Sequence, residues 1–412
     1  MYNNTVGPFM NIEQIRNQFP IFENKKDKPF IYLDNAATTQ KPQMMIDAVV
    51  DFYTQHNANI HRGIYTFGEQ ATQLYEDARA TVAQAIGAQP DEIIFVKNAT
   101  EGINLIAYSW AMQHITQGDE ILLTEYEHHA NLLPWQRVAQ KTGATLKFLP
   151  VHDDGTLAYE QLSKFVSNHT KLIACSALSN VTGAKTEVAI LANYADKVGA
   201  KLLVDAAQVM AHDTIDVKKE KIDFLVFSGH KVFGPTGIGV LYIKKELQES
   251  MVPYQLGGGM VFDVDWHDAN YLKTPQKFEA GTPPIVQAVG LAAALRWLQK
   301  QNMHDIQQHE SALMKQLING LQTISAIRIL GPIEQLKKQG HLVSFVVDGM
   351  HAHDVAAFLS DYGIAVRAGH HCVQPLAKKW NIDASVRVSL ACYNTSDEID
   401  QLIKNMKKIK KV

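Results

Sequence analysis

The chain has few cysteines, no long apolar run and little excess of charge of either sign. Its three cysteines (Cys175, Cys372 and Cys392) have no paired spacing, which argues against a disulfide framework or a zinc ribbon and favours a reducing, cytoplasmic compartment. No run of about 18 apolar residues predicts a membrane span, and residues 1–10 lack the charged-then-apolar pattern of a secretion signal. A net charge of −3 provides no broad basic surface, so we expect neither nucleic acid nor a membrane as a partner.

With 412 residues, 46% of them apolar, the chain is long enough for two domains with substantial cores. Apolar β-type runs alternate with helical patterns through its first half, which predicts an α/β fold with a mostly parallel sheet and helices on both faces. After a long helix over residues 284–299 the pattern becomes that of a smaller α+β unit. We expect a large domain over residues 23–297 and a small domain over residues 298–412. The small domain also includes residues 1–22, whose helix is expected to end at Pro20.

The most informative stretch consists of two apolar runs, residues 224–227 and 238–242, around a turn rich in glycine and polar residues. The pattern predicts strand, loop and strand, with Ser228, His230 and Lys231 together at the turn. A lysine at a strand end that faces a cavity would have a lowered pKa and an amine free to condense with a carbonyl compound. The alternative is an ordinary surface lysine.

A second apolar run, residues 201–205, ends in a carboxylate that bears on this choice. Asp205 is expected at the carboxyl end of a buried strand, the edge of an α/β sheet where ligands bind. Pyridoxal phosphate needs a lysine for its attachment and a carboxylate that faces its pyridine nitrogen. Asp205 and Lys231 supply both groups at the ends of neighbouring strands. The absence of Gly-x-Gly-x-x-Gly after a first strand argues against a nicotinamide cofactor.

The N-terminus of an expected helix, opened by residues 98–102, follows a strand directly. Thr100 is a plausible N-cap, and the free N–H groups of such a terminus suit a phosphate, although an ordinary capped helix is the alternative. His128 follows another strand and could stack on a ring or transfer protons. A metal site is not expected, because adjacent histidines rarely converge on one ion.

Cys372 lies among residues 366–373, a glycine-containing polar segment expected to be an exposed loop of the small domain. Arg367, His370 and His371 make its surroundings electropositive and favour the thiolate. A buried inert cysteine would have apolar neighbours, and three adjacent residues would make poor metal geometry. Cys175 and Cys392 are expected in the core.

Three motifs together carry a resemblance to a known family: Asp-Ala-Ala-Gln at 205–208, Ser-Gly-His-Lys at 228–231 and Arg-Ala-Gly-His-His-Cys at 367–372. From about residue 19 to the C-terminus the chain resembles the fold-type-I, pyridoxal-phosphate-dependent cysteine desulfurases. The similarity is to their group II branch, typified by the sulfur-mobilisation (Suf) desulfurase and including selenocysteine lyase-like and NifS-like enzymes.

The resemblance implies a homodimeric transferase that converts L-cysteine to L-alanine, with a persulfide on Cys372. It also implies a sulfur acceptor of the SufE or SufU type and a role in iron–sulfur cluster assembly. For catalysis it implies Cys372, Lys231 and His128, and for the substrate it implies Arg387, Asn180 and Arg367. For the cofactor it implies Lys231, Asp205, Gln208, His128, Thr100, Ser228, His230 and Asn180. It also implies that Thr282 reaches the cofactor phosphate of the other subunit.

Other interpretations stay open at this point. Arg387 suits a substrate carboxylate but could be a surface strand arginine. A selenocysteine lyase would use nearly the same residues and tolerate the loss of Cys372, and L-selenocysteine is therefore an alternative substrate. An aminotransferase would share Lys231 but would not need Cys372. A non-catalytic sulfur-relay or scaffold protein would need neither, so the presence of both argues against it.

Overall fold

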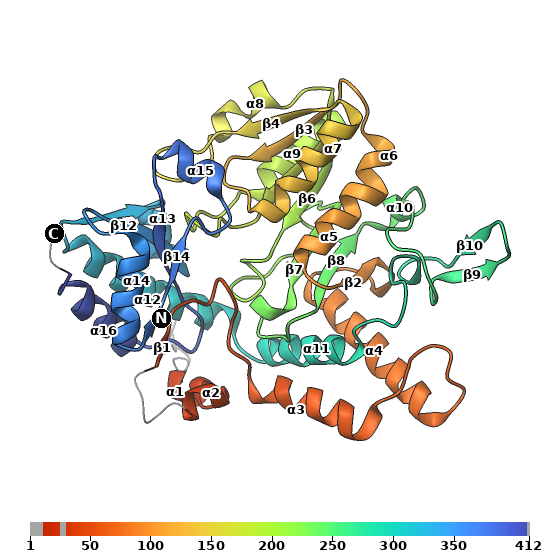
Figure 1. Ribbon diagram of the computed structural model, residues 1–412, viewed down its shortest axis with the longest axis horizontal. Coiled ribbons are helices and arrows are strands. Elements are labelled where there is room, and N and C mark those ends of the chain that lie inside the picture. Colours follow the sequence, from red (N-terminus) through yellow and green to blue (C-terminus); the bar gives the residue numbers. More distant parts are fainter. Residues whose placement is uncertain (1–10, 25–29, 410–412) are drawn as a thin grey trace, which may run out of the picture.

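The computed structural model describes residues 11–24 and 30–409 (Figure 1). Residues 1–10, for which no secretion signal is expected, lie outside the described residues. Among the residues it describes, no helix has both the length and the apolar character needed to cross a membrane.

A seven-stranded sheet occupies the middle of the molecule, with strand order β2-β8-β7-β6-β5-β3-β4. Its strands pair in parallel except β8, which is antiparallel to both of its neighbours. The predicted mostly parallel sheet is therefore confirmed. The strands are β2 (Ile93–Val96), β3 (Glu120–Thr124), β4 (Thr145–Leu149), β5 (Thr170–Ser176), β6 (Lys201–Asp205), β7 (Phe224–Ser228) and β8 (Gly239–Ile243).

Helices cover both faces of this sheet, and alternate strand residues join different cores. Leu202 and Val204 of β6 pack into a core shared with one set of helices, whereas Leu203 packs into a core on the other face. Both sets of side chains are apolar, as expected for a sheet buried on both sides. The first face carries α3 (Gln43–Asp51), α4 (Thr66–Ala85), α9 (Val188–Val198) and α11 (Ile285–Gln299); the second carries α5 (Ala99–Ile106) and α7 (Leu133–Thr142).

The C-terminal part has its own antiparallel sheet, with strand order β11-β12-β15-β14, and its own apolar core. It lies beside the large sheet (Figure 1). Its elements are α12 (Met303–Gln322), β11 (Ile327–Leu330), α13 (Ile333–Gln339), β12 (Leu342–Val347), α14 (Ala352–Asp361), β13 (Ile364–Ala365), β14 (Arg367–Gly369), α15 (Gln374–Lys379), β15 (Ser385–Ser389) and α16 (Ser396–Met406).

Two expectations for the N-terminal region are wrong. The single helix expected to end at Pro20 is two helices, α1 (Ile12–Arg16) and α2 (Pro20–Glu23), because proline fits the first position of a helix, where its missing N–H is not needed. The strand β1 (Ile31–Tyr32), expected in the large domain, pairs in parallel with β13. The chain just after residue 30 therefore packs on the C-terminal part.

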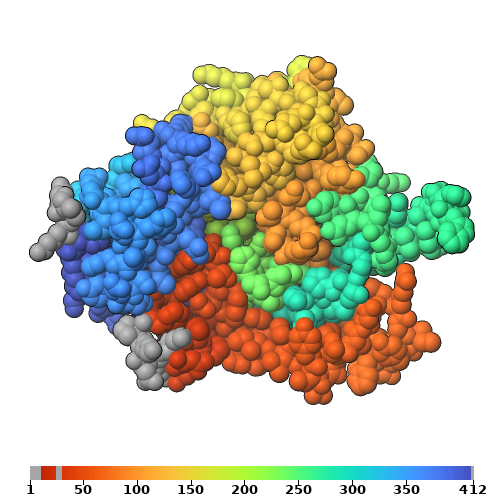
Figure 2. Space-filling view, viewed as in Figure 1, coloured from red at the N-terminus to blue at the C-terminus, as the bar shows by residue number. Residues whose placement is uncertain are grey.

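The remaining elements are short. A hairpin of β9 (Val261–Val264) and β10 (Ala269–Tyr271) projects from the molecule, with Trp266 96% exposed near its tip (Figures 1 and 2). The helices not yet named are α6 (Met112–His114), α8 (Leu162–Phe165) and α10 (Lys245–Gln248).

Candidate active site

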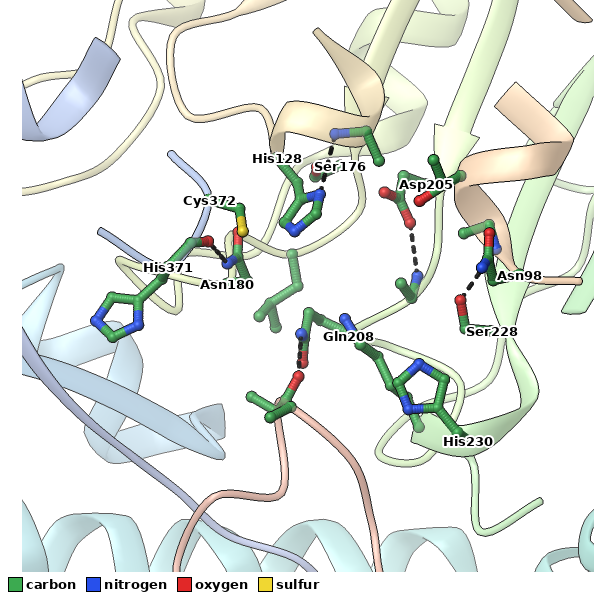
Figure 3. A pocket seen from close by; sticks show the side chains of 18 of the residues that line it. Asn98, His128, Ser176, Asn180, Asp205, Gln208, Ser228, His230, His371 and Cys372 are labelled. Carbon is green, nitrogen blue, oxygen red and sulfur yellow. Dashed lines mark hydrogen bonds between the residues drawn. The ribbon is translucent and has the colours of Figure 1, made fainter. Parts of the chain in front are cut away.

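A cavity of about 340 Å³ opens at the carboxyl ends of three neighbouring strands. β5, β6 and β7 end in Ser176, Asp205 and Ser228, and all three residues line the cavity. Figure 3 shows residues from both parts of the molecule around it. Of the residues predicted for the site, those that line this cavity are Thr100, His128, Asn180, Asp205, Gln208, Ser228, His230, Lys231, Arg367, Cys372 and Arg387.

Thr282 is the predicted residue that does not line this cavity. It is exposed on the loop before α11. The resemblance assigned it to the cofactor of another subunit, and that role stays a prediction.

Lys231 and Asp205 lie where the sequence predicted them, after β7 and at the end of β6. Burial lowers the pKa of Lys231 to about 8, with a smaller effect of the Asp205 carboxylate in the opposite direction. Burial also raises the pKa of Asp205, which accepts a hydrogen bond of 2.9 Å from the N–H of Ala207. A fraction of the Lys231 amine is therefore uncharged near neutral pH.

The main chain next to Lys231 is held by a loop that was not predicted to belong to the site. The carbonyl oxygen of His230 accepts hydrogen bonds from the Thr38 hydroxyl (3.0 Å), the Thr39 hydroxyl (3.2 Å) and the Lys41 amine (2.9 Å). Burial lowers the pKa of Lys41 to about 7. These bonds fix the 3-10 turn from which the Lys231 side chain enters the cavity.

The start of α5 also faces the cavity, but its cap is not the predicted one. Asn98 is the N-cap, and its side-chain oxygen accepts from the N–H of Glu101 at 3.0 Å; Thr100 lies in the first turn instead. Asn98 is a better cap than threonine by intrinsic preference, a signal that could have identified it. The Ser228 hydroxyl accepts from the N–H of Ala99 at 3.0 Å, which ties this helix end to β7.

His128 is held as a neutral imidazole. Burial, and then the positive charge of Lys231, lower its pKa to about 4. Its Nδ1 accepts a hydrogen bond of 3.1 Å from the N–H of Ala130, so the ring carries its proton on Nε2. The adjacent Glu127, not predicted for the site, is fully buried and accepts bonds from Asn131 and from the N–H and hydroxyl of Ser176.

Two arginines from the C-terminal part reach the cavity with one shared carboxylate, Asp34, which the sequence analysis missed. Arg367 forms an ion pair of 2.6 Å with Asp34, and Arg387 approaches the same carboxylate at 3.5 Å. Arg387 is buried, and its burial lowers its pKa to about 10. It also donates to the carbonyl oxygen of Asn180, while its Nε has no partner among the described residues.

Cys372 is exposed, whereas Cys175 and Cys392 are buried, so the predicted contrast between the three thiols is confirmed. His371 and Cys372 both have left-handed backbone angles, with φ of 52° and 60°. The Asn180 amide donates to the carbonyl oxygen of His371 at 2.6 Å, and His371 itself lines the cavity. No group of residues suited to a metal ion occurs in the part of the chain that the structure describes.

Comparison with known proteins adds to this geometry. A family model described as class-V aminotransferase matches residues 31–402. The chain belongs to that family. It is 41% identical over 409 residues to a cysteine desulfurase of Haloferax volcanii, with 96% of each chain covered. It is 43% identical over 403 residues to a probable cysteine desulfurase of Halalkalibacterium halodurans, with 97% of this chain and 98% of the relative covered.

Solved structures of cysteine desulfurases are also similar to this chain. The apo structure of a cysteine desulfurase from Thermococcus onnurineus NA1 matches with a TM-score of 0.92 at 40% identity, covering 96% of this chain and 97% of the other. The cysteine desulfurase CsdA from Escherichia coli, in an S-sulfonic acid form, matches with a TM-score of 0.90 at 36% identity, covering 97% and 98%. The predicted family, fold type I and enzyme class are confirmed.

In this class-V aminotransferase family member, the residues present fit pyridoxal phosphate, the cofactor expected from the sequence. The cavity offers an amine with a lowered pKa, a buried carboxylate, a neutral imidazole and a helix N-terminus for a phosphate. The positively charged side chain of Arg387 lines the same cavity and can pair with an anionic group. The cavity can therefore hold a cofactor and a small carboxylate together.

Proposed function

We propose that this protein is a pyridoxal-phosphate-dependent cysteine desulfurase that converts L-cysteine to L-alanine and leaves the sulfur as a persulfide on Cys372. The observation that carries the proposal is that one cavity is lined by Lys231, Asp205 and Cys372. An aminotransferase would use the first two and would have no use for an exposed thiol at the cavity.

The cofactor, when bound, accepts the electrons released at the α-carbon of the substrate. Lys231 would attach it, Asp205 would face its pyridine nitrogen, and the neutral ring of His128 would stack on it. Gln208 donates one N–H to the carbonyl oxygen of Ala36 at 2.9 Å, and its second N–H would serve the ring oxygen together with Asn180. Thr100, Ser228 and His230, at the start of α5 and after β7, would hold the phosphate.

Arg387 binds the substrate carboxylate, with Arg367 and Asn180 beside it. Its position at the cavity supports this role. Once released from the cofactor, the Lys231 amine takes the proton from the α-carbon. Asp34 already balances part of the charge of both arginines, so the substrate carboxylate adds to an existing charge network.

The sulfur then moves to Cys372. The thiolate attacks the substrate sulfur, and a sulfur–sulfur bond forms as the bond between that sulfur and the β-carbon breaks. The electron pair of the broken bond stays with the product carbon, which takes up a proton and becomes the methyl group of alanine. Lys231 returns a proton to the α-carbon, which completes the product. The exposed position of Cys372 leaves the persulfide open to an acceptor protein.

The test is release of alanine from L-cysteine, in the presence of a thiol reductant, by wild type, Cys372→Ala and Cys392→Ala. We expect Cys372→Ala to lose activity and keep the visible absorbance of the cofactor, while Cys392→Ala, which removes a buried thiol outside the cavity, stays active. Equal activity in Cys372→Ala and wild type would contradict the role of Cys372 and favour a selenocysteine lyase. No alanine from wild type would overturn the proposal.

We further propose a cytoplasmic homodimer that passes sulfur to an acceptor of the SufE or SufU type for iron–sulfur cluster assembly. Large apolar side chains lie exposed near the projecting hairpin and at the start of α4, including Trp266 and Ile64, which supports a second subunit covering them. Light scattering after gel filtration should then give about twice the chain mass of 45.9 kDa. A species of single-chain mass would contradict the dimer.

A further inference from the structure

The segment that carries Cys372 cannot hold its conformation by local interactions alone. His371 and Cys372 both have φ in the left-handed region, at 52° and 60°. Residues with a β-carbon rarely adopt that region, and two in succession need contacts from elsewhere to keep them there. Such contacts come from the large domain.

His129 provides two of these contacts. Its main-chain N–H donates to the carbonyl oxygen of Cys372 at 2.8 Å. Its imidazole Nε2 accepts from the main-chain N–H of Gln374 at 3.2 Å. Gln374 is the first residue of α15, whose N-cap residue, Val373, provides no side-chain cap. The His129 ring therefore does for α15 what an N-cap side chain usually does.

We infer that His129 is a positioning residue, which as a neutral imidazole caps α15 from across the domain boundary and so holds Cys372 at the cavity. The effect of His129 on turnover rests on the proposed function, whereas its effect on the conformation of the Cys372 segment does not.

The hydrogen bond from the Gln374 N–H to the His129 ring depends on the charge of the ring. Only the neutral ring has a nitrogen that can accept the Gln374 N–H, and a positive charge beside a helix N-terminus is unfavourable. Burial, and then the nearby His370, lower the pKa of His129, which favours the neutral ring. Protonation at lower pH would remove the cap.

The other ionisable groups near this ring belong to its own turn and to the elements packed on it. His128 lies on the same turn, with ring centroids 6.4 Å apart. The packed elements are α5, α7, β5 and, through the Gln374 hydrogen bond, α15; their ionisable residues are Glu101, Arg137, Lys141, Lys171, Cys175, Lys378 and Lys379. Glu101 pairs with Lys97, Lys171 with Asp119 and Lys379 with Glu125. His370 and His128 are therefore the neighbouring groups that the test must separate from His129.

The direct test is hydrogen–deuterium exchange of the peptide spanning residues 370–380 in the full-length protein, without substrate. His129→Ala should speed exchange by about 2- to 12-fold, the range expected for one lost hydrogen bond. His129→Gln, whose amide oxygen can also accept, should stay near wild type. Alkylation of Cys372 by iodoacetamide should follow the same order, with the buried Cys175 and Cys392 as internal controls. Unchanged exchange and alkylation in His129→Ala would overturn the inference.

The pH dependence separates the histidines. As the pH falls through the lowered pKa of His129, exchange in wild type should rise relative to His129→Gln, which cannot titrate. His370→Gln should keep this response. A response that persists in His129→Gln, or that disappears in His370→Gln, would overturn the assignment to His129.

Turnover distinguishes this inference from the proposed function. If both hold, His129→Ala should lower kcat for alanine formation and leave KM nearly unchanged, because the segment and not the carboxylate site is displaced, and His129→Gln should restore kcat. If the desulfurase proposal fails, wild type releases no alanine, while the exchange and alkylation results still test His129. A raised KM with unchanged kcat in His129→Ala would contradict the positioning role.

Discussion

Replacing Lys231 by alanine should lower alanine formation from L-cysteine by about 10³-fold or more, because in the proposed mechanism one side chain both attaches the cofactor and transfers a proton. The Lys231 amine lines the cavity and its pKa is lowered to about 8, which suits both tasks. Steady-state assays with saturating cofactor measure the effect. Lys231→Arg should not rescue the activity, because a guanidinium stays protonated at any working pH. Retention of a tenth of the activity by Lys231→Ala would contradict this role.

The same lysine gives the reaction with the cofactor a definite pH dependence. Only the uncharged amine reacts, so attachment of pyridoxal phosphate to the apoprotein should quicken as the pH rises and level off above about 8. Asp205 raises the pKa of Lys231, so Asp205→Asn should move the midpoint to lower pH. Stopped-flow absorbance measures both. A midpoint near the ordinary value for lysine would show that the amine is not desolvated.

Replacing Glu279 by alanine should destabilise the protein by about 3–5 kcal/mol, because it removes the buried carboxylate that pairs with the Arg79 guanidinium and leaves it only the partly exposed Glu76. Arg79 donates two hydrogen bonds to Glu279, at 2.8 and 2.9 Å, and the two side chains are only 1% and 4% exposed. Tyr75 and the N–H of Phe95 also donate to this carboxylate, at 3.0 and 2.7 Å. The carboxylate thus anchors the start of the loop that carries Thr282.

Urea unfolding followed by circular dichroism provides the measurement. Asp196→Ala removes a pair of similar length, 3.0 Å to Lys221, in which both partners are more than half exposed, and should hardly change the midpoint. If Glu279→Ala does not fold, Glu279→Gln keeps the shape and removes the charge, and its midpoint should still fall. Equal midpoints for the Glu279 and Asp196 variants would show that the buried ion pair contributes no more to the free energy of unfolding than the exposed one.

The sequence allowed prediction of the site residues that stand at the ends of long apolar strands. Lys231 and Asp205 follow such runs, and the carboxyl ends of neighbouring parallel strands meet at one edge of a sheet, so their proximity followed from pattern alone. The α5 terminus was located correctly, although its cap is Asn98 and not Thr100. The position of a helix end, to within one or two residues, depends on cap geometry that the sequence pattern does not contain.

The residues that were missed depend on contacts between distant segments. Asp34 follows a strand of two residues whose partner is β13, and no period can be read from two residues. His129 was not predicted for the site, because its contacts with Cys372 and Gln374 join segments more than 240 positions apart along the chain. The local sequence pattern therefore identifies polar side chains at strand ends. Which residues hold those side chains in place depends on tertiary packing, which the pattern does not contain.

The ion pair between Asp34 and Arg367 has a consequence for how the protein is made. The two residues are 333 positions apart. At ordinary rates of translation, Arg367 is synthesised about 20–70 s after Asp34. Residues 31–34 can therefore be covered by β13 and Arg367 only after most of the chain has been made, and by then all seven strands of the large sheet have been synthesised. The cofactor-binding half of the cavity is thus synthesised first, and the thiol and both arginines join it among the last events of synthesis.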